Sequence, residues 1–253
     1  MVSEIADFAV IGAGIAGASA AFRLAEYGTV LLLEGESAPG YHTTGRSAAL
    51  FSERYRNPLI RGLAQASGEL LRNPPPGFGD AGLLTDRGLM IVGTASQHEA
   101  VRHQFTDEQM RTGIAEELSV AEACELCPVL RPDYLGSARL VPQAKDIDVN
   151  ALHQGFLRGL AHAGGQLVCN ARVQGLTHSG GVWQIETQAG DFQAGVIVNA
   201  AGAWADQVGS LAGARPLGLK PKRRTCITFD PPANLAAGVP EWPMVMDAEE
   251  NFY

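Results

Sequence analysis

Cysteine is scarce in this sequence. The 253 residues include only four, Cys124, Cys127, Cys169 and Cys226. Four are too few for the disulfide framework of a secreted scaffold, and the low number agrees with a reducing compartment. Cys124 and Cys127 have C-x-x-C spacing, but no second pair accompanies them, as a zinc site of this kind requires. We therefore favour a helix that Pro128 ends over a redox or metal site at this place.

Basic residues are also few. Lys and Arg number 19 against 27 Asp and Glu, for a formal net charge of −8, and a surface of that sign repels nucleic acids and anionic membranes. The opening segment MVSEIADFAVIGAG has neither the basic n-region of a signal peptide nor an apolar run long enough to span a membrane. With 46% hydrophobic and 18% charged residues, the composition is typical of a soluble globular enzyme, and we expect a cytoplasmic location.

Several catalytic signatures are missing. The six histidines have no H-E-x-x-H or comparable metal-ligand spacing, and the chain contains no G-x-S-x-G elbow and no P-loop. These absences argue against the common zinc-protease, serine-hydrolase and P-loop kinase sites. We expect most of the histidines to lie at the surface or at helix caps. They are His42, His98, His103, His153, His162 and His178.

The clearest pattern is a βαβ unit over residues 5–34. A short apolar run, a glycine turn, a helix of small residues and the buried strand TVLLLE follow one another there. Gly12, Gly14 and Gly17 stand at G-x-G-x-x-G spacing, with Ala16 at the start of the helix. The first glycine permits a tight turn, the second lets the backbone approach a pyrophosphate, and the third lets the helix lie close to the sheet. The N-terminus of this helix would face the phosphates with its positive dipole end.

An acidic residue ends the second strand. Glu34 follows Gly14 by the interval at which a carboxylate accepts hydrogen bonds from ribose hydroxyls. The next residue, Gly35, is not an arginine, so NADP is disfavoured. Because strand, glycines, helix and acid all agree, we predict that a dinucleotide binds here.

The stretch GYHTTGRSAAL, residues 40–50, is rich in hydroxyl groups and glycine. Such a run suits a loop beside a long cofactor, because it offers N–H and O–H donors to a diphosphate and a ribityl chain. Thr44 and Gly45 also resemble a helix start, after which the small Ala48 and Ala49 would let a flat ring approach. A plain capped helix explains the same residues, so at this point both NAD and FAD remain open.

The remaining segments predict a mixed α/β fold. We expect helices over residues 57–73, over 96–110 with Ser96 as cap, and from about Asp148 to Gly164. We expect strands over residues 83–93, a hairpin over 171–190, and a strand that carries the basic cluster of residues 217–229. No internal repeat and no low-complexity linker is present.

Several longer motifs together resemble one family, the D-amino acid oxidase-like flavoproteins. The family includes glycine and sarcosine oxidases and bacterial D-amino acid dehydrogenases, and within it the likeness is strongest to D-arginine dehydrogenases. The motifs that carry the resemblance are GAGIAGAS (12–19), PGYHTTGRSAA (39–49), NPPPGF (73–78), DIDVNALHQGFLRG (146–159), VNAAGAWAD (198–206), RPLGLKPKRR (215–224) and NFY (251–253).

The resemblance implies FAD as the cofactor and a Rossmann-like α/β domain with an inserted mixed-sheet substrate domain. It assigns residues 1–85 and 146–212 to the FAD-binding domain, and 86–145 and 213–253 to the substrate lobe. Residues along the diphosphate and the isoalloxazine ring would be Thr43, Thr44, Gly45, Arg46, Ser47, Ala48, Ala49 and Leu50. Those near the adenine end would be Val173, Ala200 and Gly202. Relatives continue well past the equivalent of Tyr253, so we expect this chain to hold only part of the family's fold.

Six residues are implied by the same resemblance to form the substrate site. Arg224 would hold the substrate carboxylate, since an arginine fork matches it, and Tyr55 and Tyr253 match active-site tyrosines. The positions at which the arginine enzyme carries histidine, threonine and glutamate are here Leu50, Ser52 and Leu89. Losing the glutamate removes the partner of a cationic side chain, so we expect neutral D-amino acids as substrates.

The implied reaction is the oxidation of a D-amino acid to its imine by hydride transfer to flavin N5, after which the imine hydrolyses to a 2-oxo acid and ammonia. The electrons would pass to a quinone or another carrier, or to O2. A membrane quinone as acceptor adds the periphery of the inner membrane as an alternative location. Three alternatives remain: an amine oxidase or 2-hydroxy acid dehydrogenase on the same scaffold, an inactive FAD-binding fragment or subunit, and an NAD-dependent dehydrogenase. The oligomeric state is not predicted.

Overall fold

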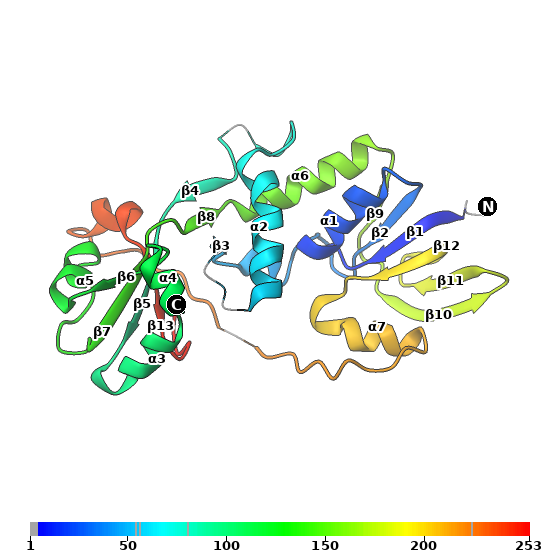
Figure 1. The fold of residues 1–253 in the computed structure, drawn as a ribbon. Helices are drawn as coiled ribbons and strands as arrows, with labels where there is room; N and C mark the ends of the chain where they lie inside the picture. The colour runs from blue at the N-terminus through cyan, green and yellow to red at the C-terminus, as the bar shows by residue number, and fades with distance from the viewer. Residues whose placement is uncertain (1–4, 54, 56, 80, 224) are drawn as a thin grey trace. The chain divides into compact units, whose positions relative to one another are not determined.

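The computed structural model describes residues 5–53, 55, 57–79, 81–223 and 225–253 (Figure 1). The chain divides into two compact units. Unit 1 comprises residues 1–47, 76–81 and 149–226, and unit 2 comprises residues 48–75, 82–148 and 227–253. The short strand β3 (Leu50–Phe51) pairs with β8 (Lys145–Ile147) and belongs to unit 2. The expected segments 1–85 and 146–212 of an FAD-binding domain stay a prediction.

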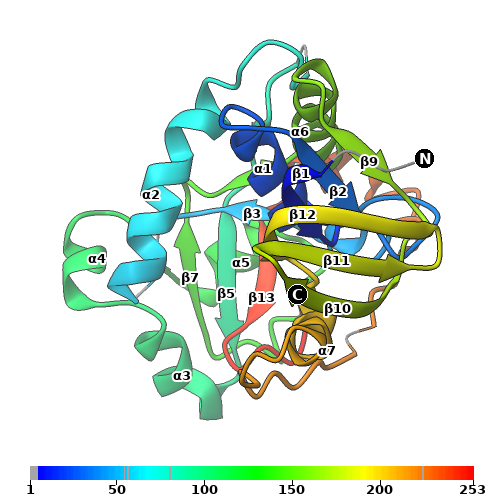
Figure 2. The same cartoon turned by 90° about the vertical axis from the view of Figure 1, so that its right-hand side faces the viewer.

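Unit 1 is built on a six-stranded sheet with the order β10-β11-β12-β1-β2-β9. Strands β12 (Gly190–Asn199), β1 (Ala6–Ile11), β2 (Val30–Leu33) and β9 (Gln166–Val168) run parallel. The hairpin of β10 (Val173–Ser179) and β11 (Val182–Thr187) continues the sheet in antiparallel order, and Figure 2 shows these strands beside β12. The expected βαβ unit and hairpin are therefore confirmed.

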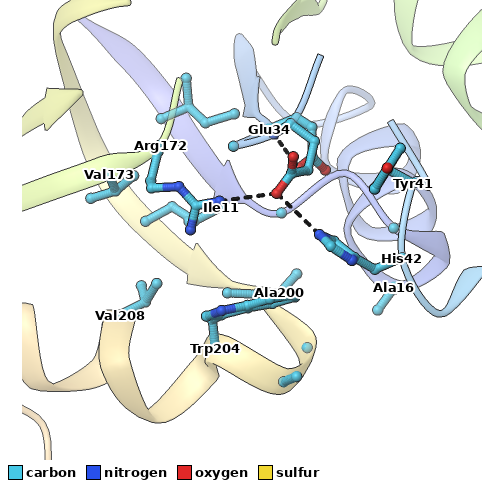
Figure 3. A pocket seen from close by; sticks show the side chains of 18 of the residues that line it. Ile11, Ala16, Glu34, Tyr41, His42, Arg172, Val173, Ala200, Trp204 and Val208 are labelled. Atoms are coloured by element: carbon cyan, nitrogen blue, oxygen red, sulfur yellow. Dashed lines mark hydrogen bonds and ion pairs between the residues drawn. The ribbon is translucent and has the colours of Figure 1, made fainter. Parts of the chain in front are cut away.

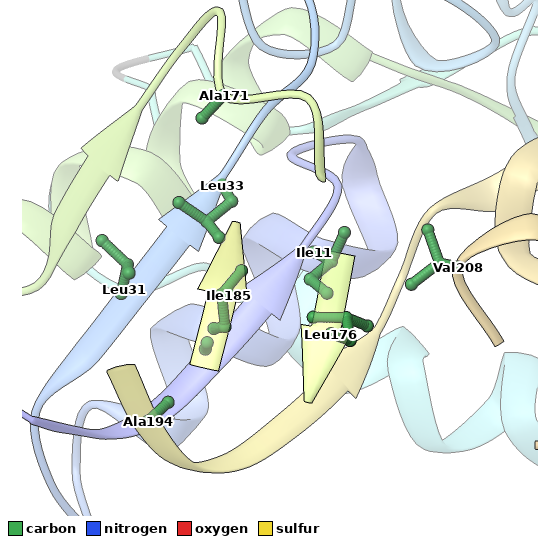
Figure 4. Close-up of a cluster of buried hydrophobic side chains, with 9 residues drawn as sticks. Ile11, Leu31, Leu33, Ala171, Leu176, Ile185, Ala194 and Val208 are labelled. Atoms are coloured by element: carbon green, nitrogen blue, oxygen red, sulfur yellow. The ribbon is translucent and has the colours of Figure 1, made fainter. Parts of the chain in front are cut away.

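Successive side chains of β1 and β2 point to opposite faces of the sheet and contribute to two apolar layers. Ile11 and Leu33 lie with Leu176 and Ile185 of the hairpin and Val208 of α7 (Ala205–Leu211) on one face (Figure 4). The residues between them in sequence lie on the other face, which α1 (Ile15–Leu24) and α6 (Val149–His162) cover. Because both faces are covered, β2 and the carboxyl-terminal half of β1 are apolar and buried without interruption.

Three phenylalanines join α1 to α6. Phe22, Phe78 and Phe156 have ring centroids 5.0 to 5.8 Å apart, in tilted and edge-to-face geometry that aromatic pairs favour. Gly159 lets this cluster form, since a Cβ at that position would lie 2.4 Å from the ring of Phe22. The packing fixes α6 against the βαβ unit.

Unit 2 contains two smaller sheets. The four-stranded sheet has the order β13-β5-β7-β6, from Met244–Asp247, Leu89–Gly93, Ser137–Val141 and Glu116–Leu118. The three-stranded sheet consists of β3, β8 and β4 (Leu84–Asp86). The helices of this unit are α2 (Pro58–Arg72), α3 (His98–His103), α4 (Asp107–Arg111) and α5 (Val120–Leu126).

Short 3-10 turns lie in both units, at Thr44–Arg46, Ala95–Gln97, Gly202–Trp204 and Ala236–Glu241.

Several local expectations were wrong. The expected strand over 83–93 is two strands, because the chain turns at Gly88, which has a positive φ of 76°. The helix expected over 96–110 is a 3-10 turn and two short helices, capped by Thr94 and Thr106 rather than Ser96. The helix start at Thr44 is a single 3-10 turn.

The strand expected over 217–229 is absent from the described residues of that segment. Asp206 of α7 accepts hydrogen bonds from the N–H groups of residues 217, 218 and 219 at 2.8 to 2.9 Å. These donors are therefore not available to a neighbouring strand, and the segment leaves α7 as an irregular connection.

Asp247 ends β13 and is fully buried. Its carboxylate accepts hydrogen bonds from the backbone of Glu249, from the backbone and side chain of Asn251, and from the side chain of Gln97, at 2.8 to 3.2 Å. Burial raises the pKa of Asp247, but these hydrogen bonds outweigh burial and hold the pKa below its usual range. The carboxylate therefore organises the loop that leads to Tyr253.

We expect Asp247→Ala to lower the free energy of unfolding by about 3 kcal/mol, because four partly buried hydrogen bonds lose their buried acceptor. The stabilisation by the carboxylate should be present above the ordinary aspartate pKa of about 3.9 and be lost as the pH falls through the lowered value. Urea unfolding at neutral pH measures the change. Glu116→Ala on the exposed strand β6 is the control and should change stability by less than about 0.5 kcal/mol; equal effects of the two substitutions would contradict this role of Asp247.

Candidate functional site

A cavity of about 580 Å³ opens in unit 1 at the carboxyl ends of the parallel strands (Figure 3). Ile11, Leu33 and Ala200, at or just beyond the ends of β1, β2 and β12, all line it. Ligands of open α/β sheets bind at this edge, where loops from neighbouring strands meet. The cavity is therefore the candidate binding site.

The glycine turn between β1 and α1 forms one wall. Gly12 has a φ of +102°, and a Cβ there would lie 2.5 Å from the carbonyl oxygen of Ala200. A Cβ at Gly17 would lie 1.7 Å from the carbonyl oxygen of Gly12. Only glycine at these two positions allows the turn, α1 and β12 to approach this closely. Gly14 and Ala16 line the cavity, so the backbone at the start of α1 is open to a ligand.

The N-terminus of α1 lies beside the hydroxyl-rich loop. Gly14 is the N-cap and supplies no side chain. The hydroxyl of Thr44 instead accepts a hydrogen bond from the N–H of Ile15 at 2.9 Å. The loop and the helix thereby share one wall of the cavity, with the positive end of the helix dipole directed at it, which suits a diphosphate.

Glu34 occupies the end of β2, as the sequence predicted. One oxygen accepts the N–H of Ala13 at 2.9 Å and the other accepts the N–H of Glu36 at 3.0 Å. A carboxylate has about four acceptor positions, so about two remain for the hydroxyls of a ribose. The side chain lines the cavity, and its geometry fits the adenosine half of a dinucleotide.

A second carboxylate, Glu36, joins the hydroxyl-rich loop to Arg172 at the cavity. Its Oε1 accepts from His42 at 3.0 Å and from Arg172 at 2.9 Å. The hydrogen bond from His42, together with the charge of Arg172, holds the pKa of Glu36 below its usual range. The His42 ring lies 4.6 Å from the ring of Trp204. Sequence reasoning missed these four cavity residues, although each adjoins a motif that it did use.

The predicted cofactor residues divide into three groups. Those that line the cavity are Gly12, Gly14, Ala16, Glu34, Gly35, Thr43, Thr44, Val173, Ala200 and Gly202. Those in unit 1 that do not line it are Gly17, Gly45, Arg46 and Ser47. Gly17 serves packing, and the N–H of Gly45 bonds to the carbonyl of Gly40 at 2.8 Å. Ala48, Ala49 and Leu50 belong to unit 2, and their contact with a flavin stays a prediction.

The predicted substrate residues belong to unit 2, except Arg224, which lies outside the described residues. Leu89 is 2% exposed, and Leu50 packs against the same buried cluster. Ser52 is also buried, whereas Tyr55 and Tyr253 are 39% and 56% exposed. The structure thus brings the two leucines together and leaves both tyrosines accessible.

Metal-ligand groups, disulfides and membrane-spanning helices were not expected from the sequence. No group of three or more His, Cys, Asp or Glu side chains in the described residues is placed to hold a metal ion. Cys124, Cys127, Cys169 and Cys226 are not in disulfides. Within the same residues, no helix combines the length and the apolar character needed to cross a membrane.

We expect Glu34→Gln to weaken the binding of FAD, the cofactor implied by the sequence motifs, about 10- to 100-fold. The neutral amide gives up charge-assisted hydrogen bonds to the ribose, each of which contributes about 1.5 to 3 kcal/mol. Titration of the apoprotein with FAD, followed by flavin fluorescence, measures the dissociation constant. Glu26→Gln, at the exposed end of α1, is the matched control. An unchanged constant in Glu34→Gln would exclude the ribose contact.

Comparison with known proteins gives one family and related enzymes of several kinds. Residues 7–253 match the DAO family model, described as FAD dependent oxidoreductase. The chain is 29% identical to L-2-hydroxyglutarate dehydrogenase of Escherichia coli (strain K12), over 83% of this chain and 50% of that protein. It is 28% identical to mitochondrial sarcosine dehydrogenase of Mus musculus, over 83% of this chain and 24% of that protein.

A solved structure supports the fold. Glycine oxidase from Geobacillus kaustophilus matches with a TM-score of 0.73 and 22% identity, over 82% of this chain and 58% of that chain. The chain thus spans about half the length of the first of these curated relatives. The family match indicates FAD as the ligand, and the glycine turn, the acid after β2 and the hydroxyl-rich loop form the candidate site for it. The chain belongs to the DAO family of FAD-dependent oxidoreductases, and FAD is its cofactor.

Proposed function

We propose that this chain is the FAD-binding and substrate-contacting part of a dehydrogenase for D-amino acids with neutral side chains. The observation that carries the proposal is the packing of Leu50 against the apolar cluster of unit 2 that contains Leu89; by the family resemblance, the D-arginine dehydrogenases carry polar groups at these two positions. The proposal places the enzyme in the cytoplasm and sends its electrons to a quinone or a similar carrier.

The residues of unit 1 fit FAD. Glu34 would bind the adenosine ribose, and Val173, Ala200 and Gly202 would lie along the adenine end. The start of α1 and Thr44 would hold the diphosphate. When bound, FAD supplies the acceptor for the hydride that leaves the substrate. The protein contributes binding, orientation and the exclusion of water.

An apolar cluster next to the substrate would favour a neutral substrate side chain. Leu89 is almost fully buried, and the cluster around it also contains Phe105, Val141 and Ala248. A cationic side chain brought against such a surface would lose its hydration without gaining a carboxylate partner, which costs several kcal/mol. An aliphatic side chain would gain from the same burial. The cluster therefore supports discrimination against D-arginine.

The substrate carboxylate needs a cation. We assign this role to Arg224 from the sequence resemblance, because a guanidinium binds a carboxylate through two parallel hydrogen bonds. Tyr55 and Tyr253 would donate hydroxyl hydrogen bonds to the carboxylate or to the amine. Both tyrosines are exposed in unit 2, which leaves them accessible to a ligand.

The relatives favour a second candidate. The names of the enzymes reported above include a 2-hydroxy acid dehydrogenase and a dehydrogenase of an N-methylated amino acid. These substrates share with D-amino acids a carboxylate next to a carbon that bears both hydrogen and a heteroatom. A 2-hydroxy acid or a secondary amine is therefore the alternative substrate on the same site.

The first test is an anaerobic visible spectrum of the FAD-loaded protein before and after a mixture of neutral D-amino acids is added. We expect the flavin band to bleach, because substrate oxidation reduces the flavin. Admission of air then separates the two acceptor classes, since an oxidase recovers its colour quickly and a dehydrogenase slowly. Bleaching by 2-hydroxyglutarate or sarcosine alone would support the second candidate instead.

Arg224→Gln provides the control for the carboxylate contact, with Arg223→Gln as the matched neighbour. Arg223 is exposed in the structure. We expect the Arg224 variant to need about tenfold more substrate for half-maximal bleaching, and the Arg223 variant to behave as the unchanged protein. Equal behaviour of the two variants would remove Arg224 from the site.

We expect Leu50→Glu to shift the ratio of rates for D-arginine and D-leucine at least tenfold toward D-arginine, because the new carboxylate pairs with the cationic substrate. Leu50→Gln has the same size without the charge and should not produce the shift. Steady-state kcat/KM values for both substrates measure the ratio. The Leu89→Glu and Leu89→Gln pair repeats the comparison at the buried position, with circular dichroism as a check of folding. Ratios that stay unchanged at both positions would place the leucines away from the substrate side chain.

A further inference from the structure

One buried histidine departs from the expectation of surface or capping positions. His153 of α6 is 4% exposed, and its Nε2 lies 2.9 Å from the carbonyl oxygen of Ala13 in the glycine turn. A carbonyl oxygen can only accept a hydrogen bond, so the imidazole carries its proton on Nε2 and donates it. No role in the reaction or in metal binding accounts for this contact.

The hydrogen bond fixes the direction of a peptide group. In a trans peptide the carbonyl and the following N–H point in opposite directions. The carbonyl of Ala13 points at His153, so the N–H of Gly14 in the same peptide points away from the histidine. Gly14 lines the cavity. The N–H of Ala13 is held in turn by Glu34, and residue 13 is therefore held through its N–H and its carbonyl.

The same ring sets the position of the hydroxyl-rich loop. Gly40 has a φ of +75°, and a Cβ there would lie 2.9 Å from Cε1 and 3.2 Å from Nδ1 of His153. The carbonyl of Gly40 accepts the N–H of Gly45 and closes the turn that carries Thr44. The loop therefore rests on the imidazole with no room for a larger residue at position 40.

A closed set of contacts follows from these observations. His153 bonds to the glycine turn at Ala13 and occupies the space beside Gly40 of the loop, and the loop returns to the helix start through the hydrogen bond from Ile15 to Thr44. We infer that His153 is a positioning residue for the FAD diphosphate, which sets the distance between the two backbone segments that bind it. This inference rests on FAD as the cofactor and not on the identity of the substrate.

Substitutions of His153 by side chains that match different parts of the imidazole provide the test. Glutamine places an amide N–H near the position of Nε2, asparagine places one near Nδ1, and leucine fills the volume without a donor. We expect His153→Leu and His153→Asn to weaken FAD binding about tenfold or more, because the carbonyl of Ala13 loses its donor. His153→Gln should stay within about threefold of the unchanged protein. Titration of the apoprotein, followed by flavin fluorescence, gives the dissociation constants.

Two further readouts separate positioning from general stability. The visible circular dichroism of bound flavin should change in His153→Leu and His153→Asn at FAD saturation and be restored in His153→Gln. The urea midpoints of the apoproteins show whether the fold itself is weakened, and His162→Gln, at the exposed end of the same helix, is the control. The inference is overturned if His153→Leu binds FAD like the unchanged protein. It is also overturned if glutamine fails to rescue binding, or if FAD affinity merely follows the apoprotein midpoints across the series.

Discussion

The close approach of the glycine turn to the end of β12 is the constraint on which the site depends. The N–H of Ala200 bonds to the carbonyl of Ile11 at 2.9 Å, and the turn at Gly12 leaves no room for a side chain against Ala200. This contact brings the ends of β1 and β12 together and opens the start of α1 toward the cavity. Glu34, Thr44 and Val173 can then reach the same ligand from three separate parts of the chain. Any outward movement of the turn would separate these groups from one another.

Much of unit 1 could be predicted from sequence because its signals are local. The spacing of the three glycines, the apolar runs at β1 and β2 and the acid at position 34 each follow from backbone geometry over a few residues. The contacts that sequence reasoning missed join distant segments. Arg172 contacts Glu36, and His153 contacts Ala13, across 136 and 140 residues of sequence. A single charged or polar residue gives no local signal of such a partner.

Unit 2 was harder to predict for the same physical reason. Its strands are short, and β13 pairs with β5 although most of the unit separates them in sequence. In the segment expected as a strand over 217–229, the first three backbone donors bond to Asp206 instead of a neighbouring strand, a competition that composition does not reveal. The candidate substrate residues came from family resemblance, and structure adds that Leu50 and Leu89 share one cluster. Neither propensity nor periodicity alone indicates that contact.

The order of strands in unit 1 has a consequence for biosynthesis. Strand β1 is central in the sheet, but one of its two neighbours, β12, is made only after most of the chain has been synthesised. During translation the nascent β1 and β2 therefore present an apolar, unpaired edge for many seconds, because ribosomes add only about 5 to 20 residues each second. Such an edge can pair with other chains. Until β12 is made and closes the sheet, this edge stays open to association with other chains.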